Sequence, residues 1–173
     1  VFLLASVLLF TYALREEASI LLKEAPEMLV QKLVAGRHEL IPVAYVDRIK
    51  AIRGVNSIKA RLWGYYYDPV VGANYTLMVA EEPEASSGRI AVGEGVSRTR
   101  LAFPGDTIEF RTYQGMTIEL EINKVFSSES GLVSSDLVLI SEEDFRKIFG
   151  TPNDYATDLA VSVRNSKELS TIA

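Results

Sequence analysis

His38 is the only histidine in the chain, and it is the first residue to consider as a catalytic base. A hydrolytic site needs a nucleophile beside such a base, and a zinc site without cysteine usually needs two or more imidazoles. The chain offers neither a cysteine nor a second histidine. We therefore interpret His38, in Gly36-Arg37-His38-Glu39, as a surface or turn residue beside Glu39, and keep a hydrolase that uses it as an alternative.

Gly93-Glu94-Gly95 follows a short predicted strand and precedes a predicted helix, which is where a dinucleotide-binding loop would lie. The third glycine of that fingerprint is missing, because position 98 is Arg98. The pattern therefore indicates a tight strand-to-helix turn rather than a nucleotide site.

Two further polar motifs are weaker. The acids Glu81, Glu82 and Glu84 surround Pro83 but lack the spacing of a calcium loop, so we expect a solvated turn. Asn74-Tyr75-Thr76 matches a glycosylation sequon, which matters only if this face is extracytoplasmic.

An aromatic cluster is the best candidate for binding. It lies next to Asp68-Pro69, where a strand is expected to end, and consists of Trp63, Tyr65, Tyr66 and Tyr67. Aromatic residues at a strand end can simply cover the core. They can also form a partner-contact surface, because Trp and Tyr combine a large rigid area with a polar group. Both interpretations stay open.

The composition is that of a globular domain and excludes several classes of function. The 173 residues are 48% hydrophobic and 24% charged, which fits one core or two small subdomains. The net charge of -5 arises from 18 basic and 23 acidic residues without a basic run, so nucleic acid is a poor partner. The absence of cysteine excludes disulfides, thiolate nucleophiles and cysteine-ligated metals.

Residues 1–14 carry no charge, and their only polar side chains are Ser6, Thr11 and Tyr12. As a helix this run would reach roughly 21 Å, short of the roughly 30 Å core of a bilayer. The sequence also opens with Val1 rather than Met. We expect it to begin inside a transmembrane helix. A signal peptide and a helix buried in a soluble core are the alternatives.

Both ends of the sequence have the pattern of helices. After Leu14 an apolar stripe continues among charged residues as far as Pro26, which predicts an amphipathic stalk beyond the membrane. At the other end, Asn165 or Ser166 can cap a helix that starts at Lys167. We expect an insertion between two transmembrane helices.

Two strand-helix-strand segments flank a β-rich middle. Hydrophobic periodicity predicts the first over residues 28–34, 43–53 and 55–63, and the second over residues 136–140, 145–149 and 158–164. The second helix follows Ser141-Glu142-Glu143-Asp144, which resembles a capping box. Gly150 and Pro152 are expected to end it.

The middle is predicted to be a small twisted β subdomain. Strands are expected over 74–80 and 89–92, a short helix over 94–101, and a hairpin whose strands at 106–113 and 116–126 are joined by Gln114-Gly115. The predicted fold class is therefore α+β.

In this order, the motifs resemble the MacB-like periplasmic core domain of permeases in the FtsX/LolC/MacB group of type VII ABC transporters. The resemblance covers nearly the whole chain and consists of Leu29-Val30-Gln31-Lys32 with Gly36-Arg37, Ile52-Arg53-Gly54-Val55, Ile90-Ala91-Val92-Gly93-Glu94-Gly95-Val96, Pro104-Gly105-Asp106-Thr107, Ser135-Asp136-Leu137-Val138 and Thr157-Asp158-Leu159-Ala160-Val161. Asn123-Lys124-Val125-Phe126 departs from the family pattern, which puts that local turn in doubt.

The resemblance implies three parts. Residues 1–25 would be the end of a transmembrane helix and a stalk. Residues 26–64 and 135–173 would form a porter-like subdomain from the two β-α-β units, and residues 65–134 a β-rich, sabre-like subdomain.

The resemblance also implies a function without catalysis. The chain would be the extracytoplasmic domain of a cell-membrane permease, in which ATP-driven helix motion acts on a partner or substrate outside the cytoplasm (mechanotransmission). Its partners would be a cytoplasmic ABC ATPase, a second permease copy, the membrane and an extracytoplasmic protein or substrate. The chain itself would hold no ATP, cofactor or metal. A membrane-anchored sensor or ligand-binding module is the alternative.

Overall fold

The computed structural model describes residues 2–23, 25–80, 86–127 and 135–165, together with Lys167 and Leu169. The acidic segment Glu81 to Glu84 lies outside this part, as do most residues of the predicted C-terminal helix. The backbone N–H of Lys167 donates to Asn165 Oδ1 at 3.1 Å, the contact expected of a capping residue.

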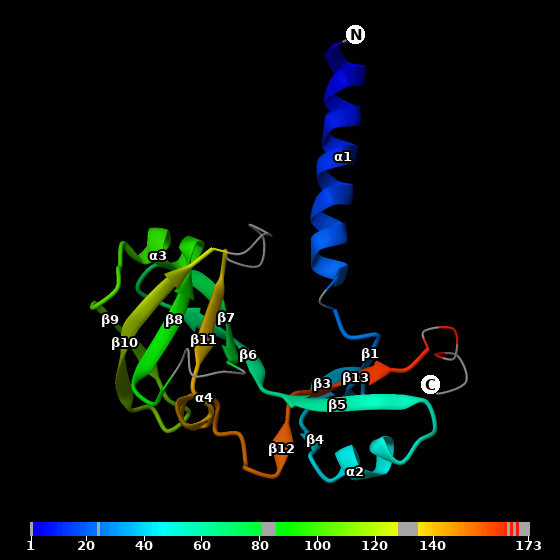
Figure 1. The fold of residues 1–173 in the computed structure, drawn as a ribbon. Helices are drawn as coiled ribbons and strands as arrows, with labels where there is room; N and C mark the ends of the chain where they lie inside the picture. Colours follow the sequence, from blue (N-terminus) through cyan, green and yellow to red (C-terminus); the bar gives the residue numbers. More distant parts are fainter. Residues whose placement is uncertain are drawn as a thin grey trace.

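The N-terminal helix α1 (Phe2–Lys23) stands away from the rest of the chain (Figure 1). Its large apolar side chains from Phe2 to Leu14 are more than half exposed. None of the helices in the described ranges combines the length and hydropathy that crossing a bilayer requires. The helix itself is therefore confirmed, whereas its place in a membrane stays a prediction.

A three-stranded sheet lies beneath α1, with the order β1-β13-β5 (Figure 1). Its strands are β1 (Met28–Val30), β13 (Asp158–Val163) and β5 (Val55–Arg61). The central strand β13 runs antiparallel to both neighbours. The short helix α2 (Tyr45–Lys50) packs against this sheet through Val46 and Ile49, which contact buried Leu159 and its neighbours.

Two short pairs accompany this sheet. The strand β4 (Ile41–Pro42) pairs with β12 (Tyr155–Ala156), and β2 (Lys32–Val34) forms a hairpin with β3 (Arg37–Glu39). The predicted strand at 28–34 is thus divided at Gln31, and His38 lies in β3.

A six-stranded mixed sheet forms the second body. Its order is β6 (Trp63–Asp68), β7 (Ala73–Val79), β11 (Leu137–Ile140), β8 (Arg89–Gly93), β10 (Thr117–Phe126) and β9 (Thr107–Arg111). The strands β7 and β11 are parallel, as are β8 and β10. The helices α3 (Glu94–Arg100) and α4 (Glu142–Phe149) contribute buried side chains to its core.

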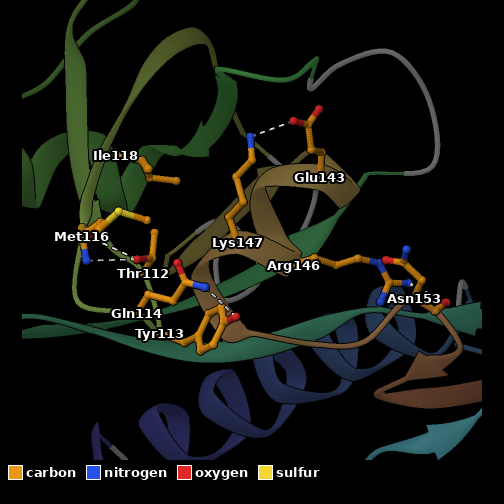
Figure 2. A pocket seen from close by; sticks show the side chains of 9 residues that line it. All are labelled: Thr112, Tyr113, Gln114, Met116, Ile118, Glu143, Arg146, Lys147 and Asn153. Atoms are coloured by element: carbon orange, nitrogen blue, oxygen red, sulfur yellow. Dashed lines mark hydrogen bonds and ion pairs between the residues drawn. The ribbon is translucent and has the colours of Figure 1, made fainter.

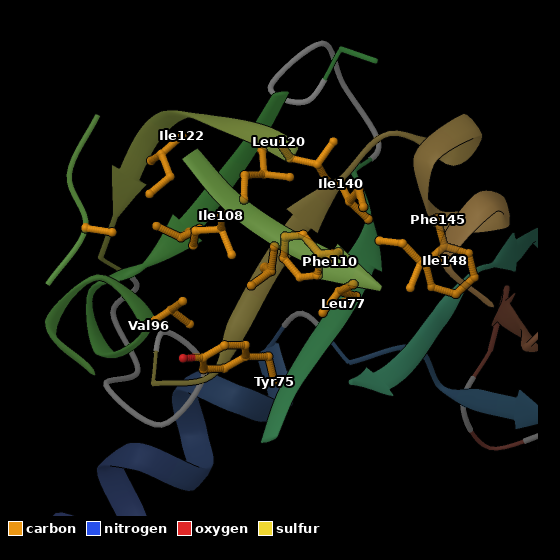
Figure 3. Packing of buried hydrophobic residues seen from close by; sticks show 14 of the residues in the cluster. Tyr75, Leu77, Val96, Ile108, Phe110, Leu120, Ile122, Ile140, Phe145 and Ile148 are labelled. Carbon is orange, nitrogen blue, oxygen red and sulfur yellow. The ribbon is translucent and has the colours of Figure 1, made fainter. Parts of the chain in front are cut away.

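This second body holds the largest core. The core combines side chains of β7, β8, β9, β10 and β11 with Val96 of α3 and with Phe145 and Ile148 of α4. Figure 3 shows the packing of these side chains. Phe110 and Phe145 are each 1% exposed. Each large apolar side chain buried in this way contributes roughly 1.5–3 kcal/mol. The strand pattern explains the core, because alternate residues of β9 are buried and exposed.

The α+β class and most predicted elements are confirmed, but one grouping is corrected. The segment with β11 and α4 was expected to join residues 158–164 in a second β-α-β unit. Instead β11 pairs with β7 and β8, whereas β13 lies in the other sheet. Its apolar run Leu137–Ile140 alternates between half-buried and buried positions there. Periodicity predicts a strand but does not specify its partner.

The residue that follows the last turn is a leucine in α3 and a glycine in α4. Both helices end in the left-handed region, with φ of 68° at Gly150 after α4 and 52° at Leu101 after α3. Glycine adopts this conformation readily, whereas other residues pay roughly 1–2 kcal/mol. The side chain of Leu101 is 78% exposed, so packing compensates little of that cost.

We therefore expect Leu101→Gly to raise the free energy of unfolding by about 0.5–1 kcal/mol, since relief of the left-handed conformation exceeds the entropy cost of glycine. Urea denaturation measures this change. The matched variant Gly150→Ala should be destabilised, because its Cβ would lie 2.7 Å from the Tyr113 ring. A less stable Leu101→Gly protein would contradict this explanation.

Candidate interaction surface

The aromatic cluster of the sequence lies on β6, an edge strand of the six-stranded sheet. Side chains alternate along a strand, so Trp63, Tyr65 and Tyr67 share one face. Tyr65 is 70% exposed and Tyr67 is 59% exposed. The rings of Trp63 and Tyr65 meet edge to face with centroids 5.6 Å apart. These three residues are called the aromatic stripe.

Tyr66 lies on the opposite face. Its ring packs edge to face on Phe110 with centroids 5.1 Å apart, and its hydroxyl accepts a hydrogen bond of 2.8 Å from the backbone N–H of Arg111. Of the four residues expected to contact a partner, Tyr66 thus serves the core. The core-covering interpretation is therefore confirmed for Tyr66, whereas a partner-contact role of the three residues of the aromatic stripe stays a prediction.

A buried carboxylate anchors the stripe at Trp63. Asp158, the first residue of β13, is fully buried and accepts 2.7 Å hydrogen bonds from Nε and Nη2 of Arg61. The Trp63 indole N–H donates to the same carboxylate at 2.9 Å. The strand β13 belongs to the small sheet and β6 to the large one, so Asp158 connects the two sheets at the position of the stripe.

The ionised state of Asp158 is favoured. Burial of the carboxyl group raises its pKa, but hydrogen bonds from Arg61 and Trp63 and the positive charge of Arg61 outweigh that effect. The pKa of Asp158 therefore lies below its usual value of 3.8. Asp158 is therefore ionised in the folded protein, and its carboxylate can accept all three hydrogen bonds.

The other sequence candidates have structural roles or lie apart. His38 is exposed on β3, with its ring centroid 5.9 Å from that of Trp63. Gly95 follows the turn from β8 into α3, where an added Cβ would lie 2.1 Å from the Ser135 carbonyl oxygen. The glycine is needed for this close packing, which explains the pattern that resembled a nucleotide loop.

The sequon lies within β7. Asn74 is exposed opposite Tyr67, while the Thr76 hydroxyl donates to Asp136 at 2.9 Å. Within the described ranges, no group of three or more His, Asp or Glu side chains is placed to hold a metal ion.

Sequence reasoning missed a pocket of about 380 Å³ between the β9–β10 turn, α4 and the segment after it (Figure 2). Its lining residues are Thr112, Tyr113, Gln114, Met116, Ile118, Glu143, Arg146, Lys147 and Asn153. The charges largely compensate one another, because Lys147 lies 2.7 Å from Glu143 and Arg146 bonds Glu142 and the carbonyl of Pro152. Only the tertiary fold brings these three segments together.

Comparison with known proteins adds information at the level of the fold. No family model matches the chain, and no curated protein sequence matches it either. A solved structure is similar: the extracellular domain of the noncanonic ABC-type transporter YknZ from Gram-positive bacteria. The TM-score is 0.50 with 9% sequence identity, over 83% of this chain and 86% of that chain. This chain has the fold of an ABC-transporter extracellular domain.

The fold expected from the resemblance to the MacB-like periplasmic domain is therefore confirmed. The shared fold does not define a substrate or a partner, because similar folds carry different functions.

We expect Asp158→Asn to lower the free energy of unfolding by about 2 kcal/mol at neutral pH, since Arg61 would lose its charged partner while one quarter of its side chain remains exposed. Because the pKa of Asp158 is lower in the folded protein, its ionised carboxylate stabilises the fold at pH values above the unfolded pKa of about 3.9. This stabilisation is lost as the pH falls through the folded pKa. The gap between the two proteins should therefore narrow in acid.

Urea denaturation at neutral pH and at about pH 3 measures both effects. Glu109→Gln, at an exposed position of β9, is the control and should change stability by less than about 0.5 kcal/mol. An Asp158→Asn protein as stable as the wild type at neutral pH would show that the buried carboxylate is not a structural connector.

Proposed function

We propose that this chain is the extracytoplasmic domain of an ABC transporter permease subunit, acting in transport at the cell membrane. The observation that carries the proposal is the fold shared with the YknZ extracellular domain over most of both chains. In the proposed protein, ATP hydrolysis takes place on a separate cytoplasmic ATPase, and this domain acts without catalysis. A second permease copy completes the transporter.

The apolar part of α1 supports a membrane anchor. Residues 1–14 are uncharged, and the described side chains of this run are exposed in the isolated chain. Such a surface is stable in lipid and costly in water. We propose that this half of α1 lies in the membrane and that the half beginning at Arg15 lies outside it.

The connection after α1 gives a route for mechanotransmission. Residues 24–27 separate α1 from β1, and Pro26 restricts the backbone between them. The strand β1 pairs with β13 from Met28 opposite Val161 to Val30 opposite Leu159. A displacement of α1 would therefore act on β13, whose Asp158 binds Arg61 and Trp63.

Two subdomains follow from this scheme. We propose that the three-stranded sheet is the porter-like part and the six-stranded sheet the sabre-like part. Relative to the division at residues 26–64, 65–134 and 135–173, we assign β11 and α4 to the sabre-like part, because β11 lies in the six-stranded sheet and α4 contributes to its core. The chain passes between the two parts at Leu62 and again after α4.

A membrane-anchored sensor or ligand-binding module is the second candidate, and the pocket of Figure 2 favours it, because its volume falls within the range of small-molecule sites. The number of membrane spans in the full-length protein distinguishes the two, since a permease has further spans.

The location can be tested by cysteine labelling, because this chain contains no cysteine. In a cysteine-free full-length protein, Thr107→Cys, at an exposed position of β9, should react with a membrane-impermeant maleimide in intact cells. Leu8→Cys should be protected, since lipid would cover a side chain that is 63% exposed in the isolated chain. Mass spectrometry measures the modified fraction.

Labelling after denaturation is the control that both thiols can react. If Thr107→Cys reacts only after the cells are permeabilised, the domain faces the cytoplasm and the proposal fails. If Leu8→Cys reacts freely in intact membranes, α1 is not embedded in lipid.

Mechanotransmission can be tested with spin labels in the full-length permease assembled with its ATPase. Labels at Glu16→Cys on α1 and Thr107→Cys on β9 should change their distance distribution when ATP is added, because motion of α1 would displace the sheets. Pulsed electron paramagnetic resonance measures this distribution. A pair at Asn74→Cys and Thr107→Cys, within one sheet, should keep its distance. An unchanged distance between the labels at positions 16 and 107 would contradict mechanotransmission through this domain.

A further inference from the structure

The edge strand β6 has an open stretch of backbone. Its partner strand β7 lies on one side only. The Val79 N–H donates to the Leu62 carbonyl, and the Gly72 N–H donates to the Asp68 carbonyl, so even-numbered residues of this strand face β7. Hydrogen-bonding directions alternate along an antiparallel pair. The N–H and C=O groups of Trp63, Tyr65 and Tyr67 therefore point away from the sheet.

The open edge is already closed at Trp63. The Trp63 N–H donates to the Thr157 hydroxyl at 3.0 Å, and that hydroxyl donates to the Trp63 carbonyl at 2.8 Å. One side chain thus takes the place of a neighbouring strand. Among the described residues, no comparable partner is found for the outward groups of Tyr65 or Tyr67.

The other edge of the same sheet is protected differently. The outer strand β9 carries Glu109 and Arg111 at exposed positions, and the outward Arg111 N–H is bound by Tyr66. Charged side chains at an edge prevent pairing with another chain. On β6, the only charged side chain is Asp68, which is buried and lies 2.8 Å from Arg100. The edge at Tyr65 and Tyr67 lacks that protection.

We propose that the β6 edge at Tyr65 and Tyr67 binds an extended segment of a partner protein by strand addition, with the aromatic stripe contacting the segment's side chains. Two outward N–H and two outward C=O groups at strand spacing complement an extended backbone. The uncharged edge suits a segment rich in β-branched and aromatic residues. The strand β13 pairs antiparallel with β5, and Thr157 just before it bonds the outward groups of Trp63. An added segment antiparallel to β6 would lie along the same edge of the chain, beyond Thr157.

This inference deepens the proposed function by naming the kind of partner, and it rests on the proposed function only for the side of the membrane on which the partner is found. The binding itself depends on the open edge, so its test is independent of the labelling experiment.

The probe is a library of random displayed peptides of about ten residues, long enough for one strand. It is selected against the whole chain held in a lipid nanodisc. Recovered peptides should bind the wild type and Tyr65→Phe with similar affinity. Tyr65→Pro and Tyr67→Pro should each weaken binding about tenfold or more, because each removes one outward N–H while leaving the pairing with β7. Biolayer interferometry measures the affinities.

A second experiment alters the peptide instead of the protein, so its result does not depend on whether the proline variants fold. A peptide that is N-methylated at alternate residues should bind the wild type about tenfold more weakly in one of its two methylation patterns only, since only one set of its N–H groups faces β6. Hydrogen exchange at the amides of Tyr65 and Tyr67 should slow when the unmodified peptide binds.

Three results would overturn the inference. The library could yield no binder that depends on this edge, both methylation patterns could bind equally, or Tyr65→Cys and Tyr67→Cys chains could crosslink to each other without peptide. The last result would show that a second copy of this chain occupies the edge.

Discussion

The ion pair between Arg61 and Asp158 is the interaction on which the arrangement of the domain depends. Two hydrogen bonds of 2.7 Å from the guanidinium and one of 2.9 Å from the Trp63 indole satisfy a carboxylate that is fully buried. Removing charges from water is costly, and only such complete pairing compensates that cost. Both charged residues belong to the small sheet, Arg61 at the end of β5 and Asp158 at the start of β13, and the bond from Trp63 of β6 ties the large sheet to this pair.

Local signals in the sequence predicted the elements well. Ser141 caps α4 as expected, with its hydroxyl oxygen accepting from the Asp144 N–H, and the 106–126 region forms the predicted hairpin. These features depend on neighbours within a few residues. The pairing of β11 with β7 joins residues about sixty positions apart, and no periodicity encodes that choice. Long-range pairing therefore required the structure.

The same limit applies to the candidate surface. Residue types identified the aromatic cluster, because Trp and Tyr combine a large rigid area with a polar group. Which of them face solvent depends on the strand register, and Tyr66 falls on the core side because β6 pairs Tyr66 with buried Tyr75. The open backbone edge had no signal in composition at all. It follows from the position of β6 at the end of the strand order, and the Thr157 hydroxyl closes this edge only at Trp63.

Leu62 is the single residue between β5 and β6, so the connection between the two sheets at this point is very short. Its carbonyl is bound by Val79, and the carbonyl of the preceding Arg61 is bound by Thr157. Because both carbonyls at this joint are hydrogen-bonded, the joint is more restrained than the flexible linkers that usually join moving domains. In the proposed transporter, a force applied to one sheet would therefore tend to rotate both sheets together, because little of it would be absorbed by bending at this joint.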